Sequence, residues 1–594
     1  MTESQVVQEP PPRRRRWGLW IFLIVVVIVV FLGVMMAIGL ASLMKGPTVE
    51  VMENSTLVID LQLPMQEMPP DPVATELFKA KILTVYDLNL ALQKAAKDTR
   101  IKSVLIKVGM TPAGFAKMQE FRSYLETFKK SKKPVWAYFE IAGNGGYYLA
   151  SMTDKICAPP SSMLLLTGLK AEIPFYRGAL EKVHVEPQLF HIGDYKSYSD
   201  IFMNKEMTEA HREATNSLLD SLYGQIRDGI AESRGIEKGR IDEIINRGFL
   251  WGEGLRENGL VDELWYQDQV EEGLMKVNGN TEKWNHVDVC SYFKDKTVDP
   301  YAGSKSTVGL VIASGGIVSG SGGKDNIGSD TTVKHLRKMG KDDSVKAVVF
   351  RVDSGGGSAV ASDMILRQVQ KLRKDNKPVV VSMSDVAASG GYWISMDSDG
   401  IVAQPGTITG SIGVVTGKFF LGGFWEWIGI NHEIIKRGDN ADLFSPLAGF
   451  SDDQAALIQA EMKSVYDDFV NKVAQGRGKT YDEIHRIGQG RVWTGEQSIE
   501  NGLIDRLGGI REAIQLAKEK AGIPEGDKVR IRVLPKPMTL MEAIFDTGVD
   551  DLARARTEAQ IPPELLEAYR TYQSIRPLTA EPIVAYTPVR VRID

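Results

Sequence analysis

Hydrophobic residues near the N-terminus form one long uninterrupted segment. No charged residue occurs between Trp17 and Met44, and every position from Ile21 to Leu32 is apolar. A helix rises about 1.5 Å per residue, so this segment is long enough to cross a hydrocarbon core of about 30 Å. The apolar part of a cleaved signal peptide is usually shorter, about 7–15 residues. The pattern therefore predicts a retained transmembrane helix over residues 17–44.

The residues that flank this segment predict its orientation. Arg13 to Arg16 stand immediately before it, and basic flanks stay in the cytoplasm, while Trp17 and Trp20 suit the membrane interface. Residues 1–16 are therefore expected to form a basic cytoplasmic N-terminus, with the rest of the chain on the opposite side. No second apolar segment approaches spanning length. The sequence predicts a single-pass protein.

Beyond the predicted anchor, short apolar segments alternate with amphipathic ones. Val348–Val352 and Val379–Met383 have the composition of buried strands, and helical periodicity lies between them at about Ala361–Lys374. A strand–helix–strand unit of this kind implies a mainly parallel sheet and an α/β fold. A longer helix is expected over Asp452–Gln475, with an acidic first turn and an end marked by Gly476.

Much of this pattern occurs twice. Segments recur in the same order at a shift of 245 or 243 residues: Gly145–Ser151 with Gly390–Met396, Asp154–Ala158 with Asp399–Ala403, and Glu257–Asp262 with Glu500–Asp505. Matches in one order at nearly one period indicate a duplication. We expect a first copy over residues 45–300, a second copy over 301–525 and a C-terminal extension over 526–594, to which the sequence assigns no role.

Composition narrows the classes of protein. With 43% hydrophobic and 25% charged residues, the 594-residue chain is neither wholly disordered nor fibrous. A net charge of −5 argues against a general nucleic-acid binder. The two cysteines, Cys157 and Cys290, exclude a disulfide scaffold and a metal site with several thiolate ligands. The sequence implies no metal and no nucleotide.

Chemistry-bearing residues occur where the two copies differ. The second copy has Asp353–Ser358, with three consecutive glycines directly after a strand, whereas the first copy has Gly109–Pro112 there. Consecutive glycines allow backbone N–H groups to approach a ligand closely. A tight turn and an oxyanion hole both fit this pattern. A phosphate loop does not, because the G-x-x-x-x-G-K-[ST] motif is absent.

A serine follows the next strand of the second copy. Ser389 lies among small residues in Ala387–Trp393, where a strand-to-helix turn can expose its hydroxyl beside the next N–H, in the manner of a nucleophile elbow. A serine in such a turn is more commonly a helix cap. The first copy has Asn144 at the matching place, so that copy lacks a nucleophile there.

A nucleophilic serine needs a base, and the best candidate is a lysine of the first copy. Lys196 lies in Gly193–Ser197, and the second copy has Ala441 at the matching position. Each copy thus lacks one of the two groups, which is expected when two copies share one catalytic site. Most lysines are solvated surface charges. A lysine base must be neutral, and burial favours this by lowering its pKa from about 10.4. We therefore expect an activity that rises with pH.

These motifs carry a family resemblance. Together, Ala387–Trp393, Asp353–Ser358, Gly410–Gly413 and Gly193–Ser197 resemble the signal peptide peptidase A family, in its long, duplicated, membrane-anchored type. The resemblance runs from roughly Pro47 to Ile523 and includes the N-terminal anchor. It implies a serine endopeptidase with a Ser–Lys dyad on two tandem crotonase/Clp-protease-like α/β domains. Such enzymes degrade cleaved signal peptides in or at the membrane.

The resemblance also implies a role for each site residue. Ser389 is expected to be the nucleophile, Lys196 the general base and Ser411 the hydroxyl that orients the lysine. The oxyanion hole is expected to combine the N–H of Gly390 with one from Gly356 or Gly357. The sequence does not choose between these two glycines.

The implied partners are remnant signal peptides and other unfolded hydrophobic peptides, membrane lipid, and further copies of the chain in a homotetramer. Neither a cofactor nor a nucleic acid is implied. The implied location is a bacterial inner membrane with the catalytic domains in the periplasm, and an equivalent topology in a thylakoid also fits. Two other interpretations stay open. A crotonase-type acyl-CoA enzyme would share the fold without needing Ser389 and Lys196 together, and a non-enzymatic membrane scaffold would not explain why these residues segregate between copies.

Overall fold

A computed structural model describes residues 26–28, 31, 35, 50–69, 82–323, 325–536 and 584–586 of the protein. They belong to two compact units, Met1–Glu50 and Val51–Asp594. The transmembrane helix expected over residues 17–44 lies outside the described residues, except at 26–28, 31 and 35, which are helical. Within the described ranges, no helix is both long enough and apolar enough to span a membrane.

The first copy is built on a six-stranded parallel sheet, in the order β10-β1-β2-β3-β5-β9. Its strands are Ser55–Asp60 (β1), Ile101–Lys107 (β2), Val135–Tyr138 (β3), Lys155–Ala158 (β5), Glu263–Leu264 (β9) and His286–Asp288 (β10). A small sheet adds Ile141–Ala142 (β4), Met163–Leu165 (β6) and Phe249–Trp251 (β8). The helices of this copy are Val85–Lys97 (α2), Phe115–Lys129 (α3), Asn144–Ala150 (α4), Arg177–Lys182 (α5), Asp200–Met203 (α6), Glu209–Arg234 (α7), Lys238–Arg247 (α8), Glu253–Glu257 (α9), Gln267–Val277 (α10) and Val289–Lys294 (α11).

The second copy is built on an eight-stranded, mainly parallel sheet, along the path β20-β18-β16-β14-β11-β22. β17 also pairs with β16, and β21 pairs with β17. Its strands are Ser306–Ser314 (β11), Val345–Ser354 (β14), Val379–Ala388 (β16), Gly400–Ala403 (β17), Ile408–Gly410 (β18), Val492–Thr494 (β20), Arg506–Leu507 (β21) and Val529–Leu534 (β22). Its helices are Ser329–Gly340 (α12), Ala359–Lys374 (α13), Gly390–Trp393 (α14), Gly422–Trp427 (α15), Asp452–Arg477 (α16), Tyr481–Ile487 (α17), Gly495–Asn501 (α18) and Ile510–Lys520 (α19).

The two sheets repeat one strand order. In the first copy the parallel path runs β1-β2-β3-β5-β9, and in the second it runs β11-β14-β16-β17-β21. The predicted duplicated α/β architecture with mainly parallel sheets is therefore confirmed. The predicted unit appears as β14, α13 and β16. Both strands are longer than expected, because Val345–Ala347 pair with β11 and Val386–Ala388 pair with β18.

The long helix α16 ends later than predicted. Ser451 caps its start with a capping box, but the helix continues to Arg477, and Gly478 adopts the left-handed conformation that ends it. Gly476 instead lies inside the last turn, where a methyl group would be 2.5 Å from the carbonyl oxygen of Met396. The glycine is therefore required there for close packing, and the expectation that it marks the helix end was wrong.

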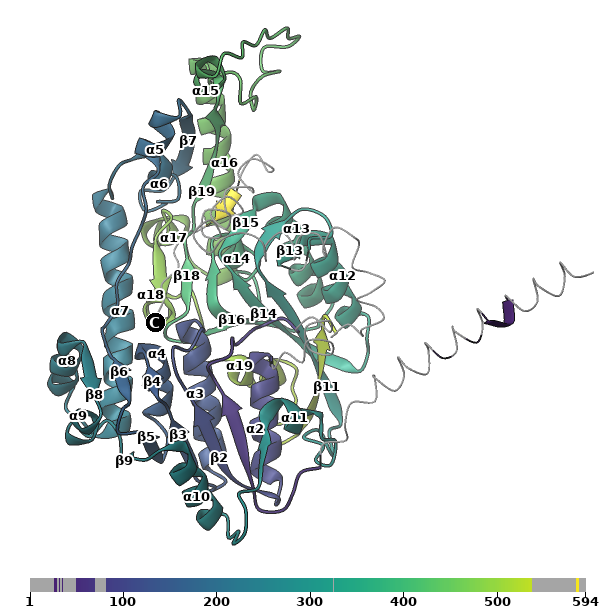
Figure 1. Cartoon of the computed structure of the whole chain (residues 1–594). Helices are drawn as coiled ribbons and strands as arrows, with labels where there is room; N and C mark the ends of the chain where they lie inside the picture. The colour runs from purple at the N-terminus through teal and green to yellow at the C-terminus, as the bar shows by residue number, and fades with distance from the viewer. Residues whose placement is uncertain are drawn as a thin grey trace, which may run out of the picture. The chain divides into compact units, whose positions relative to one another are not determined.

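A third sheet joins the two copies. It has the order β13-β12-β15-β23-β19-β7, with strands Glu186–Ile192 (β7), Gly316–Val318 (β12), Asn326–Gly328 (β13), Gly356–Ser358 (β15), Val414–Phe420 (β19) and Val584–Tyr586 (β23). The first-copy strand β7 pairs antiparallel with the second-copy strand β19, from Glu186 opposite Phe420 to Ile192 opposite Val414. Figure 1 shows this ribbon beside the long helix α16. It delivers the chain after Ile192 to the second copy.

The extension after residue 525 contributes strands to these sheets. β22 pairs in parallel with β11 at the edge of the second copy's sheet. β23 pairs antiparallel with β15 and with β19, so it lies between them. The period-2 alternation of Val529–Leu534 is a strand signal. The extension thus carries structural elements, although the sequence assigned it no role.

Buried ion pairs also fasten the copies to each other. Arg351 on β14 is fully buried and contacts carboxylates of the first copy, Glu67 and Glu120, each at 2.7 Å. Burial by itself would raise the pKa of Glu67, but the Arg351 guanidinium outweighs it and lowers that pKa to about 2. Glu67 therefore stabilises the fold above its unfolded-state pKa, and that contribution is lost as the pH falls toward 2.

A second ion-pair cluster lies at the start of the glycine turn. Lys117 on α3 donates to Asp353 at 2.7 Å and to Asp385 at 2.6 Å, and its backbone N–H donates to Asp385 at 3.0 Å. Asp353 is the second-last residue of β14, which leads into the turn, and Asp385 lies four residues before Ser389. A first-copy lysine thus fixes the two second-copy strands that carry the predicted site.

We predict that Arg351→Met destabilises the protein by about 3–5 kcal/mol, because Glu67 and Glu120 would stay buried without their counter-charge. The shift of the urea unfolding midpoint measures this loss. Arg373→Met is a matched control, since Arg373 pairs with Asp397 and Asp399 at a partly exposed position. The Arg373→Met variant should lose about 1 kcal/mol or less of its free energy of unfolding. Equal shifts for the two variants would contradict the importance of the buried cluster.

Candidate active site

Ser389 lies between β16 and α14, at the strand-to-helix turn where the sequence placed it. Its φ of 55° and ψ of −114° form a sharp turn that a non-glycine residue rarely adopts. The N–H of Ser389 donates to the carbonyl oxygen of Gly410 at 2.8 Å, which holds the turn against β18. The expected exposed hydroxyl is not observed, because Ser389 is completely buried. A strained serine at such a turn is nevertheless typical of a nucleophile that the surrounding structure holds in place.

Lys196 of the first copy reaches Ser389 of the second. It follows β7, and its Nζ lies 2.7 Å from the Oγ of Ser389. The same Nζ donates to the Oγ of Ser411 at 3.0 Å and to the carbonyl oxygen of Ser411 at 3.1 Å. The structure therefore brings Lys196, Ser389 and Ser411 together. This is the arrangement that the reciprocal differences between the copies predicted.

The amine of Lys196 is almost completely excluded from water, with 2% of the residue exposed. Burial disfavours the charged ammonium and lowers the pKa of Lys196 from its ordinary value of 10.5 to about 7. Near neutral pH a large share of the amine is therefore unprotonated. A neutral amine at 2.7 Å can take the hydroxyl proton of Ser389, which makes the serine oxygen a stronger nucleophile.

A loop of the second copy, Gly488–Arg491, holds both ends of this arrangement. The carbonyl of Gln489 accepts a hydrogen bond from the N–H of Tyr195 at 2.9 Å, and the carbonyl of Arg491 accepts one from the N–H of Ser411 at 2.7 Å. Gly490 has a φ of 80°, and a methyl group on it would lie 2.6 Å from the Cβ of Lys196. Sequence reasoning missed this loop. Its only signal was the pair of glycines on either side of Gln489, and glycine has no reactive side chain.

The glycine turn of β14 and β15 lies next to Ser389. The N–H of Gly356 donates to the Oγ of Ser354 at 3.1 Å. A methyl group on Gly390 would lie 3.0 Å from the amide nitrogen of Gly357. The three predicted oxyanion glycines therefore lie against one another, and of these the N–H of Gly356 has a partner within the turn.

The short strand β23 lies against this glycine turn. It pairs antiparallel with β15, with Ala585 opposite Gly357 and Tyr586 opposite Gly356. Any side chain on Gly356 would overlap the carbonyl oxygen of Ala585 and approach the amide nitrogen of Gly390 to 2.8 Å. The Ala585 carbonyl and the Gly390 amide therefore face one small space. An extended backbone occupies the surface beside Ser389.

The matching positions of the other copy serve different purposes. The side-chain amide of Asn144 donates to the carbonyl of Gly168 at 3.1 Å and accepts from the N–H of Gly168 at 3.2 Å. Ala441 lies in an exposed turn after Gly438. Among the described residues, the serine–lysine arrangement therefore occurs once.

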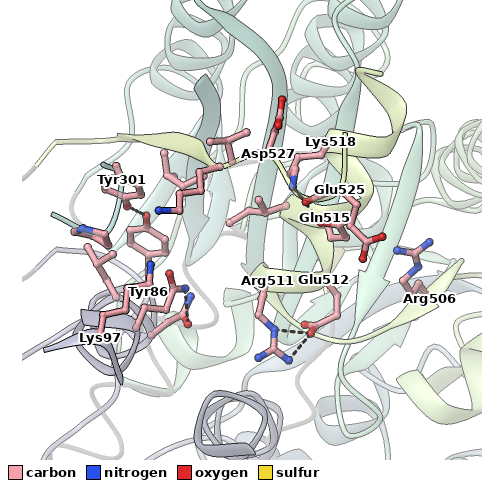
Figure 2. Close-up of a pocket in the computed structure, with 18 residues that line it drawn as sticks. Tyr86, Lys97, Tyr301, Arg506, Arg511, Glu512, Gln515, Lys518, Glu525 and Asp527 are labelled. Carbon is pink, nitrogen blue, oxygen red and sulfur yellow. Dashed lines mark hydrogen bonds and ion pairs between the residues drawn. The ribbon is translucent and has the colours of Figure 1, made fainter. Parts of the chain in front are cut away.

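A cavity elsewhere at the junction of the copies takes no part in this site. It has a volume of about 430 Å³ and is lined by residues of α2, α19 and β22, among others. Figure 2 shows the side chains around it. Tyr86, Arg511 and Glu512 are among its lining residues, and Lys196, Ser389 and Ser411 are not. Arg511 forms an ion pair with Glu512 at 2.8 Å, so much of the charge at its wall is neutralised internally.

Comparison with known proteins identifies a family. The sequence model of Peptidase family S49 matches residues 127–280 and again 371–524. A chloroplastic serine protease SPPA of Arabidopsis thaliana is 36% identical over 475 residues, which cover 78% of this chain and 69% of that protein. Protease 4 of Salmonella typhi is 30% identical over 500 residues, 83% of this chain and 81% of the relative. Protease 4 of Haemophilus influenzae is 29% identical over 452 residues, 74% and 73% of the two chains.

Solved structures overlap with parts of the chain. A membrane-bound stomatin-specific protease is 18% identical, with a TM-score of 0.25 over 39% of this chain and 99% of that chain. ClpP1 of Listeria monocytogenes is 12% identical, with a TM-score of 0.21 over 33% of this chain and 89% of that chain.

We predict that Gly490→Ala removes most of the reactivity of Ser389 toward a fluorophosphonate probe. The new methyl group would displace the backbone of Lys196, and its amine would leave Ser389. Gly478→Ala is a matched control, because Gly478 also has a positive φ, of 63°, but a methyl group there meets no atom within 4 Å. Both substitutions carry a backbone strain of about 1 kcal/mol, so only the contact with Lys196 separates them. Equal labelling rates in the two variants would refute the positioning role of Gly490.

Proposed function

The chain belongs to Peptidase family S49 and is a serine protease, and we propose that it cuts peptide bonds with a Ser389–Lys196 dyad completed across its two copies. The observation that carries this proposal is the 2.7 Å distance between the Nζ of Lys196 and the Oγ of Ser389. Complete burial of the amine supports its role as a base. The segregation of serine and lysine between the copies supports a single shared site.

The first chemical step adds the oxygen of Ser389 to the substrate. The neutral amine of Lys196 takes the hydroxyl proton of Ser389, and the Oγ attacks the carbonyl carbon of the peptide bond. The carbonyl oxygen becomes negative and accepts hydrogen bonds from the N–H groups of Gly390 and Gly357. We assign the second donor to Gly357 because the N–H of Gly356 is already donated to Ser354.

The remaining steps release both halves of the substrate. The protonated Lys196 gives its proton to the leaving amine, so the peptide bond breaks and the ester on Ser389 remains. Water then attacks the ester carbonyl while Lys196 accepts a proton from it. The bond between the acyl carbon and the Oγ of Ser389 breaks, Lys196 returns the proton to that Oγ, and the carboxylate leaves. Ser411 acts as a positioning residue, because its hydroxyl and carbonyl oxygens hold the Nζ of Lys196 in line with Ser389 throughout.

We further propose that the substrates are cleaved signal peptides and other unfolded hydrophobic peptides, cut at the membrane surface by an anchored enzyme. The apolar segment at residues 17–44 supports the anchor. Exposed apolar side chains gather in and after α15, a part of the chain that projects beyond β7 and β19 (Figure 1), and include Trp427, Ile428, Ile430, Ile434 and Ile435. Such clusters mark contacts with lipid or with apolar partners. Assembly into a homotetramer in a bacterial inner membrane stays a prediction.

We predict that the rate of peptide cleavage at subsaturating substrate rises with pH through an inflection near pH 7 and is constant above it. The pKa of Lys196 is lowered to about 7, so below that value the amine is a cation and accepts no proton, while above it the amine is a base. The measurement is a profile of kcat/KM from about pH 5 to pH 9. Lys196→Arg keeps a permanent cation and should be inactive throughout. A profile without a change across this range would remove Lys196 as the base.

The activity itself is tested on a synthetic signal peptide with a long apolar core. Full-length protein in detergent should cleave the peptide at internal bonds, and both Ser389→Ala and Lys196→Met should reduce the rate by at least about a thousandfold, as loss of a catalytic group does. Labelling of Ser389 by a fluorophosphonate should disappear in the same variants. Cleavage that survives in either variant contradicts the dyad. Hydrolysis of an acyl-CoA without peptide cleavage would favour a crotonase-type enzyme, and no reaction at all would favour a scaffold.

A further inference from the structure

A cationic side chain beside the dyad joins the two copies. Arg491 of the second copy donates from its Nη1 to the Oε1 of Glu213 on α7 at 2.6 Å. The hydroxyl of Tyr195 donates to the other carboxylate oxygen of Glu213 at 3.0 Å. The Cζ of Arg491 lies 4.9 Å from the ring centroid of Tyr195 and 4.3 Å from that of Trp493. We call these four residues, Arg491, Glu213, Tyr195 and Trp493, the Arg491 clamp.

The backbone of the Arg491 clamp continues into the contacts that hold the Lys196 amine. Tyr195 immediately precedes Lys196 in the chain. The carbonyl of Arg491 accepts a hydrogen bond from the N–H of Ser411, and the two oxygens of Ser411 accept hydrogen bonds from the Nζ of Lys196. A displacement of the Arg491 side chain would therefore be transmitted to the backbone on both sides of this amine.

The surroundings of Arg491 differ from those of an ordinary surface ion pair. Its Nε is buried and has no hydrogen-bond acceptor among the described residues, so hydrogen bonds alone do not explain where the guanidinium lies. It lies instead over aromatic rings, an arrangement that arginine favours. The indole N–H of Trp493 donates to the carbonyl of Ile487 at 2.8 Å, which fixes this ring at the start of the Gly488–Arg491 loop.

We propose that Arg491 is a positioning residue of the protease, which holds the Gly488–Arg491 loop against Lys196 and so keeps water away from its amine. This inference rests on the proposed function and extends it to a residue that acts through its neighbours. The exposed fraction falls from 52% for the Glu213 side chain to 18% for that of Arg491 and 2% for Lys196. The Arg491 clamp thus extends from the solvent to the buried amine.

The acidic and phenolic groups of the Arg491 clamp keep their charge states over the range in which the amine titrates. Hydrogen bonds from Tyr195 and Arg491 lower the pKa of Glu213, and the hydrogen bond to Glu213 raises the pKa of Tyr195. Glu213 therefore stays an anion and Tyr195 stays neutral from about pH 5 to pH 9. Burial is the cause that lowers the pKa of Lys196, so access of water to the amine would raise that pKa.

Further titratable groups lie on the other elements around the loop. The hydroxyl oxygen of Tyr466 on α16 accepts a hydrogen bond from the N–H of Gln489 at 3.3 Å and lies 2.8 Å from the Nδ1 of His485 on α17. The first copy adds His191 on β7 and Asp194 beside Tyr195. All of these groups are unaltered in the variants described below, so a difference between variants reports on the Arg491 clamp.

The test replaces Arg491 by methionine, which removes the charge and the planar group and keeps an unbranched side chain. In the full-length Arg491→Met protein, we expect the inflection of the kcat/KM profile to move up by at least about one pH unit from its position near pH 7, because water reaches the amine. A shift of one unit leaves about a fivefold smaller share of neutral amine at pH 7. The rate should fall accordingly at pH 7 and recover above the new inflection.

Arg234→Met is the matched control. Arg234 lies at the other end of α7, pairs with Asp262 at 2.8 Å and has an 11% exposed side chain, so its loss should leave the inflection in place. Glu213→Gln removes only the charge of the partner and should move the inflection in the same direction by less, which keeps the test independent of the folding of Arg491→Met. An unmoved inflection in the two clamp variants, or an equal shift in Arg234→Met, would overturn the proposal.

Failure of this inference and failure of the proposed function give different results. If the unmodified protein and both clamp variants share one inflection near pH 7 and one rate of Ser389 labelling by a fluorophosphonate, the dyad stands and the positioning role of Arg491 is refuted. If Ser389 of the unmodified protein is not labelled at any pH, the proposed function fails, and the role of Arg491 fails with it.

Discussion

The site depends on one costly interaction, the burial of an amine against an alcohol. The Nζ of Lys196 lies 2.7 Å from the Oγ of Ser389, in surroundings that exclude water from it. Because burial lowers the pKa of Lys196 to about 7, the amine can serve near neutral pH as the base that the proposed mechanism needs. In the proposed mechanism, the strained turn at Ser389 and the amides of Gly357 and Gly390 contribute to catalysis only while this amine stays excluded from water and beside Ser389.

The amine of Lys196 is held in this buried position by contacts between the two copies. The β7–β19 ribbon brings Lys196 to the second copy, and the Gly488–Arg491 loop holds it there beside Ser411. On the other side of the glycine turn, Lys117 fixes Asp353 and Asp385, and Arg351 binds Glu67 and Glu120. Stability and reactivity therefore share one interface. At the matching positions of the opposite copies, Asn144 binds the backbone of Gly168 and Ala441 lies in an exposed turn.

The sequence predicted the features that depend on local patterns and on comparison of the two copies. Buried strands such as the one predicted over Val379–Met383 and the serine turn that follows could be found from composition and spacing. The segregation of Lys196 and Ser389 between the copies predicted that the two residues meet. Features formed by distant backbone contacts could not. Gly490 acts through its lack of a side chain, Gly476 serves packing instead of ending a helix, and β23 acquires meaning only from the strands on either side.

The most direct test changes the basicity of the Lys196 amine and leaves its position unaltered. Lys196→Cys, in a chain whose Cys157 and Cys290 are replaced by alanine, is alkylated with 2-bromoethylamine to give γ-thialysine, a weaker base of nearly the same length. The measurement is the pH dependence of peptide cleavage, compared with that of the lysine protein in the same background. We expect the inflection to move to lower pH in the thialysine protein, because the titrating group is this amine. An inflection that stays where it is would contradict the assignment of Lys196 as the base.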